Sequence, residues 1–373
     1  MSSTKIFISA GESSGDIYSA KLAEELLKTD PSIEIKAIGG DRVESAGASL
    51  LYHIRNTAFM GFAEVVKHLP SIWKIWRSTI KYIESEKPEL IILVDYPGFN
   101  LRLAKAAYKR GISVIYYISP QVWAWNQSRV KKIRKYTKEV LCIFPFEVEW
   151  YHGKGVNAEF IGHPLLDIYD FDMNDSGKRI IGEKKHLLGL FPGSRQQEVD
   201  KHLDIMIKAV YGLRDRDDSY EAAIAIAPDV EVEKYRQLYP YNWLHWIENS
   251  NHTIMKQSDL LIMSSGTATV EAALHQTPMI VIYRVSPISY WLGKRLIKVP
   301  YIAMVNLIGG KKGVPELIQN EATPENIIAE VEKLLDTPSV KNETDLFLKS
   351  VKTSLGSAGA SRRAADIIYR YLK

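Results

Sequence analysis

The chain has 373 residues, of which 46% are hydrophobic and 25% charged, a balance typical of a folded protein with about two domains. Its single cysteine, Cys142, lies in an apolar run, which excludes an internal disulfide and suits a reducing cytosol. The N-terminus has no secretory signal pattern, and no window approaches the roughly 20 apolar residues that span a membrane. These features predict a cytoplasmic protein that is soluble or attached to a membrane surface.

The net charge is only +4, but the positive charge is concentrated in two segments. Residues 102–138 contain ten lysines and arginines and no acidic residue, and residues 65–83 contain four and none. Such segments are typical of surfaces that bind nucleic acid or anionic lipid, and the alternative is a set of scattered, solvated lysines.

Short apolar segments alternate with helical patterns, as in parallel sheets covered on both faces. The alternation stops in a polar stretch at residues 170–185 and then restarts. We therefore expect an α/β protein with two Rossmann-like domains, residues 1–168 and 185–350, whose facing crevices form a deep cleft, and a helix in residues 351–373 that packs back on the first domain. The strands are expected at residues 5–10, 34–38, 90–94, 113–118, 139–144, 186–191, 221–227, 259–263 and 278–283.

The turn at residues 11–16 (GESSGD) directly follows the first strand and precedes a helix whose free N–H groups could bind an anion. It lacks the G-x-G-x-x-G spacing of dinucleotide sites, and the charge of Glu12 would repel a pyrophosphate. A capped strand-to-helix turn is the alternative. By itself this motif identifies no ligand.

Asp95 ends the apolar strand 90–94, at the edge of the sheet where such folds bind ligands. A carboxylate in this position can act as the general base for a hydroxyl group. Its alternative role, capping the next helix, is filled more naturally by Asn100. We therefore predict that Asp95 is a general base.

Two tryptophans, Trp123 and Trp125, follow strand 113–118 in a proline turn. They could stack on a sugar, line an acyl chain or belong to the core. A cluster of lysines and arginines follows at residues 129–138 and predicts a basic surface nearby.

The second domain begins with a turn at residues 191–198 (FPGSRQQE). Gly193 and Ser194 can present N–H groups to a phosphate, and Arg195 can neutralise a diphosphate with a charge-assisted bond. The alternative is a surface arginine paired with Glu198.

A second turn of this kind lies at residues 263–274 (MSSGTATVEAAL). Ser265, Gly266 and Thr267 lie at a helix N-terminus, which suits a diphosphate, and Glu271 could hold ribose hydroxyls. A well-capped helix is the alternative, but the two turns together favour phosphate binding. The nine histidines are scattered, so we expect no metal site and no cofactor.

Taken in order, these motifs resemble those of lipid A disaccharide synthases over residues 5 to about 320. The segments that carry the resemblance are 11–16 (GESSGD), 39–40 (GG), 60–65 (MGFAEV), 94–100 (VDYPGFN), 119–125 (SPQVWAW), 160–164 (FIGHP), 192–195 (PGSR), 265–267 (SGT) with 271–274 (EAAL), and 306–308 (NLI).

The resemblance implies a GT-B fold and an inverting glycosyltransferase. It implies UDP-2,3-diacylglucosamine as donor, 2,3-diacylglucosamine 1-phosphate (lipid X) as acceptor, and a β-1,6-linked disaccharide 1-phosphate and UDP as products. It also implies an enzyme associated peripherally with the inner membrane and without a nucleic-acid partner. A homodimer is a further possibility.

The family's catalytic aspartate corresponds to Asp95, and its acidic residue in the first glycine loop corresponds to Glu12. The arginine that contacts UDP corresponds to Arg195, and an asparagine of the second domain to Asn306. The acceptor side would include Ser14, Met60, Trp123 and Trp125. The chain departs from many relatives at Gly98, where they carry a second acid, and at residues 310–312 (GKK), which are more basic.

Three alternatives belong to other classes: a UDP-sugar epimerase of the same fold acting on unacylated substrate, a nucleotide-binding module or NAD-dependent oxidoreductase, and a membrane-binding scaffold. The missing G-x-G-x-x-G motif argues against NAD, and a scaffold would not need Asp95.

Residues 70–83 predict an amphipathic helix that begins at Pro70. Isoleucines and tryptophans, including Trp73 and Trp76, cover more than the stripe that a core-facing helix needs, and lysine and arginine occupy the rest. This composition is typical of an interfacial helix, and the alternative is an ordinary domain helix with buried tryptophans. We expect residues 70–83 and 129–138 to bind an anionic membrane.

Overall fold

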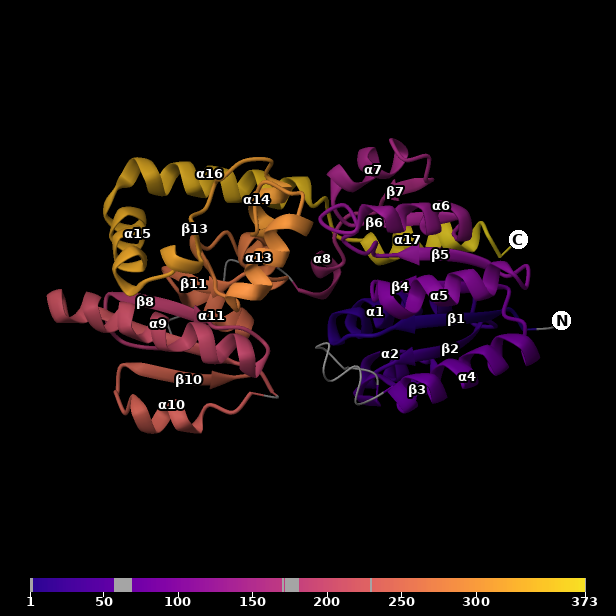
Figure 1. Ribbon diagram of the computed structural model, residues 1–373, viewed down its shortest axis with the longest axis horizontal. Coiled ribbons are helices and arrows are strands. Elements are labelled where there is room, and N and C mark those ends of the chain that lie inside the picture. The colour runs from indigo at the N-terminus through magenta and orange to yellow at the C-terminus, as the bar shows by residue number, and fades with distance from the viewer. Residues whose placement is uncertain (1–2, 57–68, 170, 172–180, 229, 373) are drawn as a thin grey trace. The chain divides into compact units, whose positions relative to one another are not determined.

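The computed structural model describes residues 3–56, 69–169, 171, 181–228 and 230–372. The chain forms two compact units, one made of Met1–Asp170 with Leu355–Lys373 and the other of Phe171–Ser354 (Figure 1). The strands are β1 (Lys5–Ala10), β2 (Glu34–Gly39), β3 (Ser49–His53), β4 (Leu90–Val94), β5 (Ser113–Tyr117), β6 (Glu139–Cys142), β7 (Ala158–Phe160), β8 (His186–Phe191), β9 (Tyr220–Ile226), β10 (Leu244–Glu248), β11 (Leu260–Ser264), β12 (Met279–Tyr283) and β13 (Glu316–Ile318).

Helices connect these strands. In the first unit they are α1 (Ser13–Thr29), α2 (Asp41–Ser45), α4 (Leu69–Ser85), α5 (Pro97–Tyr108), α6 (Val130–Tyr136), α7 (Pro145–His152), α8 (Leu165–Ile168) and α17 (Ala360–Tyr369). In the second unit they are α9 (Gln196–Arg216), α10 (Glu233–Leu238), α11 (Asn251–Gln257), α12 (Ala268–His275), α13 (Pro287–Leu296), α14 (Met304–Ile308), α15 (Pro324–Asp336) and α16 (Pro338–Ser354).

Each unit is built on one parallel sheet. The strand order is β3-β2-β1-β4-β5-β6-β7 in the first and β10-β9-β8-β11-β12-β13 in the second. In both, the chain winds outward from the first strand in one direction and then restarts on its other side, which is the doubly wound Rossmann topology. The point of reversal lies between β1 and β4 in one sheet and between β8 and β11 in the other.

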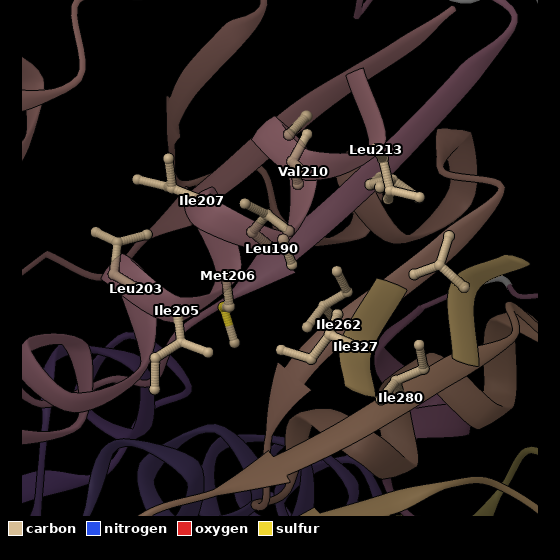
Figure 2. Close-up of a cluster of buried hydrophobic side chains, with 14 of the residues drawn as sticks. Leu190, Leu203, Ile205, Met206, Ile207, Val210, Leu213, Ile262, Ile280 and Ile327 are labelled. Atoms are coloured by element: carbon tan, nitrogen blue, oxygen red, sulfur yellow. The ribbon is translucent and has the colours of Figure 1, made fainter. Parts of the chain in front are cut away.

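The core of the second unit lies between its sheet and the helices α9 and α15. Figure 2 shows Leu203, Met206 and Val210 of α9 in one buried cluster with Leu190 and Ile262 of the sheet. These α9 residues recur at intervals of three and four, so they form one apolar face of the helix, and this face is buried.

The last helix, α17, belongs to the first unit, where it packs against α1 and α8. Asp167 at the end of α8 accepts hydrogen bonds from the backbone N–H groups of Ala360 (3.1 Å) and Ser361 (2.7 Å), which begin α17. Arg363 of α17 donates to the carbonyl of Ile161 at 2.7 Å. The chain therefore returns to its first unit through specific polar contacts as well as apolar packing.

The helices in the described part of the chain include none that is both long enough and apolar enough to cross a bilayer.

Candidate active site

Two acidic residues meet at the reversal point of the first sheet. Glu12 lies between β1 and α1, directly before the first residue of the helix, and Asp95 follows β4. Because β1 and β4 are neighbouring parallel strands, both residues emerge at the same edge of the sheet. This edge is where doubly wound folds bind ligands.

The backbone at Asp95 is held in an unusual conformation. Asp95 (φ 42°) and Tyr96 (φ 46°) both lie in the left-handed region, which is strained for residues other than glycine. The Asp95 carbonyl accepts hydrogen bonds from the Tyr116 hydroxyl (2.6 Å) and the Asn100 amide (2.8 Å). The buried Asn100 also accepts a bond from the Ser9 hydroxyl at 2.7 Å. Asn100, which sequence reasoning assigned to helix capping, therefore holds the carboxyl ends of β1 and β4 together.

The environment of Asp95 suits a proton acceptor. Burial and the nearby charge of Glu12 raise the pKa of the Asp95 carboxyl to about 7, although the backbone N–H of Tyr96 acts in the opposite direction. A carboxyl whose pKa lies near neutral pH is present in both protonation states there. It can accept a proton and still retain a useful driving force for the transfer, as general-base catalysis requires.

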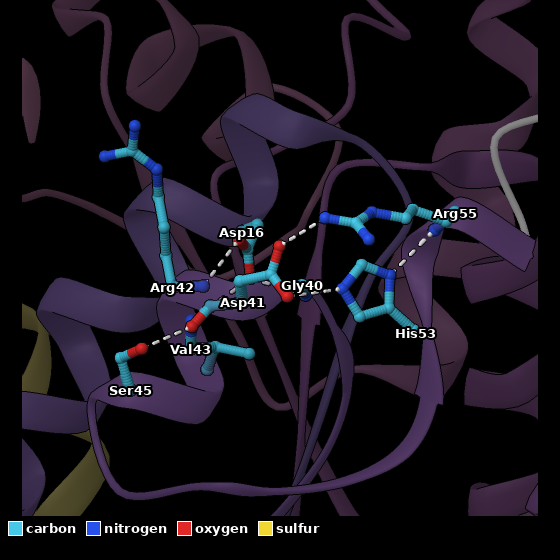
Figure 3. A network of polar contacts seen from close by, with 8 residues as sticks. All are labelled: Asp16, Gly40, Asp41, Arg42, Val43, Ser45, His53 and Arg55. Atoms are coloured by element: carbon cyan, nitrogen blue, oxygen red, sulfur yellow. Dashed lines mark hydrogen bonds and ion pairs between the residues drawn. The ribbon is translucent and has the colours of Figure 1, made fainter.

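Asp16, the last residue of the first glycine motif, has a structural role (Figure 3). Its buried carboxylate accepts hydrogen bonds from the backbone N–H groups of Gly40 (2.6 Å), Arg42 (3.2 Å) and Val43 (3.2 Å). A side chain at position 40 would come within 2.6 Å of this carboxylate, so the glycine is required. Asp16 thus fixes the turn between β2 and α2, a function that the sequence motif did not reveal.

The turn after β5 contains one buried and one exposed tryptophan. Trp123 is only 4% exposed, and its indole N–H donates to the buried Glu147 at 2.9 Å. The Ser119 hydroxyl donates to the same carboxylate at 2.7 Å. Trp123 therefore supports the turn from inside, and its burial favours the core interpretation over a stacking surface. Trp125 is 44% exposed, and the Arg129 guanidinium lies 4.8 Å from its ring centre.

Glu147 was not identified from the sequence. Burial raises the pKa of its carboxyl to about 7 against the opposing effect of its hydrogen bonds, and its charge contributes to the raised pKa of Asp95. Of the other residues expected on the acceptor side, Ser14 lies half-buried in the first turn of α1. Met60 lies outside the described residues.

The two turns of the second unit follow β8 and β11, which are neighbours in its sheet. In the first, Gly193 has a φ of 132°, and a side chain there would come within 2.4 Å of Glu198. The Ser194 N–H donates to the Glu198 carboxylate at 3.1 Å, and the Arg195 guanidinium lies 3.6 Å from it. Arg195 is exposed, and it is the residue directly before the first turn of α9.

In the second turn, Gly266 and Thr267 are exposed at the N-terminus of α12. The Ser265 hydroxyl donates to the carbonyl of Ile302 at 2.9 Å, so this side chain anchors the turn to the segment before α14. Burial raises the pKa of Glu271, in the first turn of α12, to about 7, and the ring of His252 lies 3.9 Å from its carboxylate.

Asn306 is buried, and its side-chain amide makes four hydrogen bonds within the second unit. It donates to the Val314 carbonyl (3.0 Å) and Glu316 (2.8 Å) and accepts from the N–H groups of Gly313 (2.9 Å) and Val314 (3.0 Å). The four bonds exhaust what an asparagine amide can make. In this arrangement Asn306 fixes the turn between α14 and β13 and has no amide group to spare for a ligand.

His202 is a further residue that sequence reasoning missed. One ring nitrogen, Nδ1, lies 2.9 Å from the Pro192 carbonyl, and the other accepts from the Arg284 N–H at 2.9 Å. Burial lowers the pKa of this imidazole, which keeps it in the neutral form that both contacts require. His202 therefore joins the turn after β8 to the end of β12.

The described residues contain no group of three or more histidine, cysteine, aspartate or glutamate side chains arranged to hold a metal ion.

Comparisons with known proteins identify the family. A family model described as lipid-A-disaccharide synthetase matches residues 6–366 of the chain. The lipid-A-disaccharide synthase of Geobacter metallireducens is 37% identical over 373 residues, which cover 99% of this chain and 97% of that protein. The chain belongs to the lipid-A-disaccharide synthetase family. It is therefore a glycosyltransferase, as the resemblance of its motifs predicted.

Solved structures show the fold of this family member. The glycosyltransferase of kitacinnamycin is 16% identical, with a TM-score of 0.67 over 99% of both chains. A UDP-GlcNAc 2-epimerase from Neisseria meningitidis is 13% identical, with a TM-score of 0.68 over 98% of this chain and all of that one. The GT-B fold expected from the sequence is confirmed, and the epimerase alternative is reduced to a distant structural relation.

Proposed function

We propose that this chain joins UDP-2,3-diacylglucosamine to 2,3-diacylglucosamine 1-phosphate and releases UDP, with Asp95 as the general base. The observation that carries the assignment of the base is the position of Asp95: a carboxyl with a pKa of about 7, at the reversal point of a doubly wound sheet, in a chain of this family. The acceptor hydroxyl attacks the anomeric carbon of the donor, and its proton passes to the Asp95 carboxylate. The bond from that carbon to the UDP oxygen breaks, and inversion follows from attack on the opposite face.

We propose that Glu12 sets the protonation of this base. Its negative charge favours a proton on Asp95, which keeps the pKa of that carboxyl high enough to accept the hydroxyl proton. Glu12 precedes the first residue of α1, and Ser14 is two positions further on, in the first turn of that helix.

The second unit supplies the proposed UDP site. Gly193, Ser194 and Arg195 would bind the diphosphate with backbone N–H groups and one guanidinium, in place of the Glu198 carboxylate that Ser194 and Arg195 contact in this structure. The exposed turn at residues 265–267 would add the N-terminus of α12. Glu271 would accept hydrogen bonds from the ribose. Donors fixed before the reaction stabilise the charge that develops on UDP, so this site does not require a metal. Chelators should accordingly leave the activity unchanged.

Two adjacent cavities in the first unit, both lined by apolar side chains, support the assignment of acylated substrates. A groove of about 610 Å³ between α4 and α5 combines aromatic and aliphatic side chains with four cations. A smaller apolar pocket beside it shares Ile72 and Phe99 with the groove and reaches Tyr96, the neighbour of Asp95. The groove is lined by Ile72, Trp73, Trp76, Ile80, Phe99, Arg102, Lys105, Ala106, Lys109 and Arg110.

We further propose that residues 70–83, within α4, and the basic segment at residues 129–138 attach the protein to the inner membrane. Trp73 is 59% exposed, and lysines of α4 and α6 are exposed as well. Exposed indoles and cations without acids suit the headgroup region of an anionic bilayer. A homodimer stays a prediction, which a measurement of the mass in solution would check.

The test is release of UDP from three substrate sets: the diacylated donor with the diacylated acceptor, the donor alone, and unacylated UDP-GlcNAc. The proposed function requires release with the first set and little with the others. Formation of a 2-epimer from UDP-GlcNAc without UDP release would replace it with the epimerase function. Asp95→Asn should lower turnover by about 100-fold or more while UDP still binds, as expected for loss of a general base.

A further inference from the structure

Three of the eight tryptophans are exposed, and each has an arginine four residues later whose guanidinium lies over its ring. The distances from the guanidinium carbon to the ring centre are 4.5 Å for Trp73 with Arg77, 4.8 Å for Trp125 with Arg129, and 3.9 Å for Trp291 with Arg295. The first pair and Arg129 of the second belong to the segments already proposed to bind membrane, and Trp125 is expected on the acceptor side. The third lies on α13 in the second unit, and nothing so far assigns it a role.

The surroundings of Trp291 share the features of that membrane surface. The indole is 56% exposed, and Ile297 just beyond the helix is exposed as well. Residues 272–315 contain six lysines and arginines and no acidic residue, and Lys298 among them is exposed. Moving an exposed indole from water into a less polar phase lowers the free energy, because apolar surface is removed from water. Because this segment contains no acidic residue, its lysines and arginines would attract an anionic surface and no side chain of the segment would repel it.

The Trp291–Arg295 pair fits the lipid headgroup layer better than a protein or a polynucleotide. An indole has an apolar body and a polar N–H, and it partitions to the boundary between headgroups and acyl chains. A guanidinium stacked on its face keeps its N–H groups available for a lipid phosphate, to which arginine can bind with two parallel bonds. A single turn of helix therefore presents both the apolar and the charged contact.

We propose that α13 is a second lipid-contacting element, through which the second unit binds the anionic bilayer surface by way of Trp291, Arg295, Ile297 and Lys298. The inference rests on the proposal that the enzyme works at a membrane, and it adds that the UDP-binding unit is attached by its own contact. Both units then stay on the membrane independently, and the second is not merely tethered through the first.

Vesicle binding of the full chain tests this inference. With vesicles containing phosphatidylglycerol, Arg295→Gln should weaken partitioning about fivefold, the effect expected for one cation near an anionic surface. Trp291→Ser should weaken it several-fold, and Trp291→Phe should restore part of the loss. The matched control is Leu238→Ser, which removes a side chain that is 62% exposed in the same unit and lies on α10. Neutral phosphatidylcholine vesicles should bind weakly and show no effect of Arg295→Gln.

A label shows whether the helix itself meets lipid. Because the single cysteine, Cys142, is buried, Trp291→Cys and Leu238→Cys can each be labelled selectively with an environment-sensitive dye. Anionic vesicles should shift the emission of the dye at position 291 to shorter wavelength and leave that at 238 unchanged. An unchanged dye at 291, or one that responds to UDP without vesicles, would overturn the inference.

The outcomes also separate this inference from the proposed function. If Trp73→Ser abolishes vesicle binding while the Trp291 and Arg295 variants bind normally, α13 has no lipid contact and the proposed reaction stands. If the wild-type chain releases no UDP from the diacylated pair, the proposed reaction fails, whatever the vesicles show.

Discussion

The ring of Tyr96 lies directly over the backbone of Gly11. A Cβ atom at position 11 would come within 2.3 Å of the ring, which is closer than real Cβ contacts. Gly11 begins the turn that follows β1, and Tyr96 follows Asp95 after the end of β4, so this contact sets how closely the two sides of the candidate site approach. The glycine of the first motif therefore makes room for an aromatic ring, whereas the sequence suggested a tight turn.

Gly11→Ala should displace Tyr96 and with it Asp95. We expect a stability loss of about 1–3 kcal/mol, the usual cost of overpacking, and a fall in turnover larger than the fall in UDP affinity. Thermal unfolding and UDP titration measure the two effects. Gly98→Ala is the matched control, because nothing lies within 4 Å of a Cβ at that position in the first turn of α5. It should be neutral or stabilise by up to ~1 kcal/mol. Equal effects of the two variants would refute the steric argument.

The pH dependence of kcat/KM should report the Asp95–Glu12 interaction. Because the pKa of Asp95 is raised to about 7 and a general base must be deprotonated, kcat/KM should rise with pH through about 7. Glu12→Gln removes a negative charge that favours the proton, so the pKa of Asp95 should fall and the rise should occur at lower pH. Glu24→Gln, on the same helix, should leave the profile where it is. A profile that does not move in Glu12→Gln, or moves to higher pH, contradicts the assignment.

Arg195→Ala should weaken UDP binding by ~1.5–3 kcal/mol, the scale of a charge-assisted hydrogen bond. Calorimetric titration with UDP measures the change. Arg216→Ala is the control at the opposite end of α9: its side chain is also exposed, and it is ion-paired with Glu332 at 2.7 Å. It should bind UDP like the wild type. If both variants lose similar UDP affinity, the effect comes from the net charge of the protein and not from a direct contact. If neither loses affinity, Arg195 does not belong to the UDP site.

The two tryptophans of α4 should behave differently. Trp73 is mostly exposed, so Trp73→Ser should reduce binding to anionic vesicles while changing the free energy of unfolding by less than about 0.5 kcal/mol. Trp76 is half-buried and packs edge-on against Phe99 at 5.6 Å, so Trp76→Ser should lower stability by about 2 kcal/mol. Vesicle sedimentation and chemical unfolding separate the two effects. Normal vesicle binding by Trp73→Ser would assign the membrane contact to another surface.

The sequence determined every strand in the interior of the two sheets. The nine predicted strands correspond to β1, β2, β4, β5, β6, β8, β9, β11 and β12. An interior strand is covered on both faces, so its residues are apolar without interruption, as in Leu90–Val94, and a single sequence shows this directly. The strand ends then located Asp95 and the two turns of the second unit, because ligand sites of such folds lie at the carboxyl ends of strands.

The edge strands of the two sheets became apparent only in the tertiary structure. The four strands that the pattern missed, β3, β7, β10 and β13, are the four outermost strands of the two sheets. An edge strand pairs on one side only and is partly exposed, so it lacks a continuous apolar run and gains its order from its neighbour. Contacts of buried polar side chains with backbone groups elsewhere in the chain were likewise visible only in the tertiary structure. The carboxylate of Asp16 is buried against backbone N–H groups more than twenty residues away, at Gly40 and Val43, and only the fold brings those groups within reach.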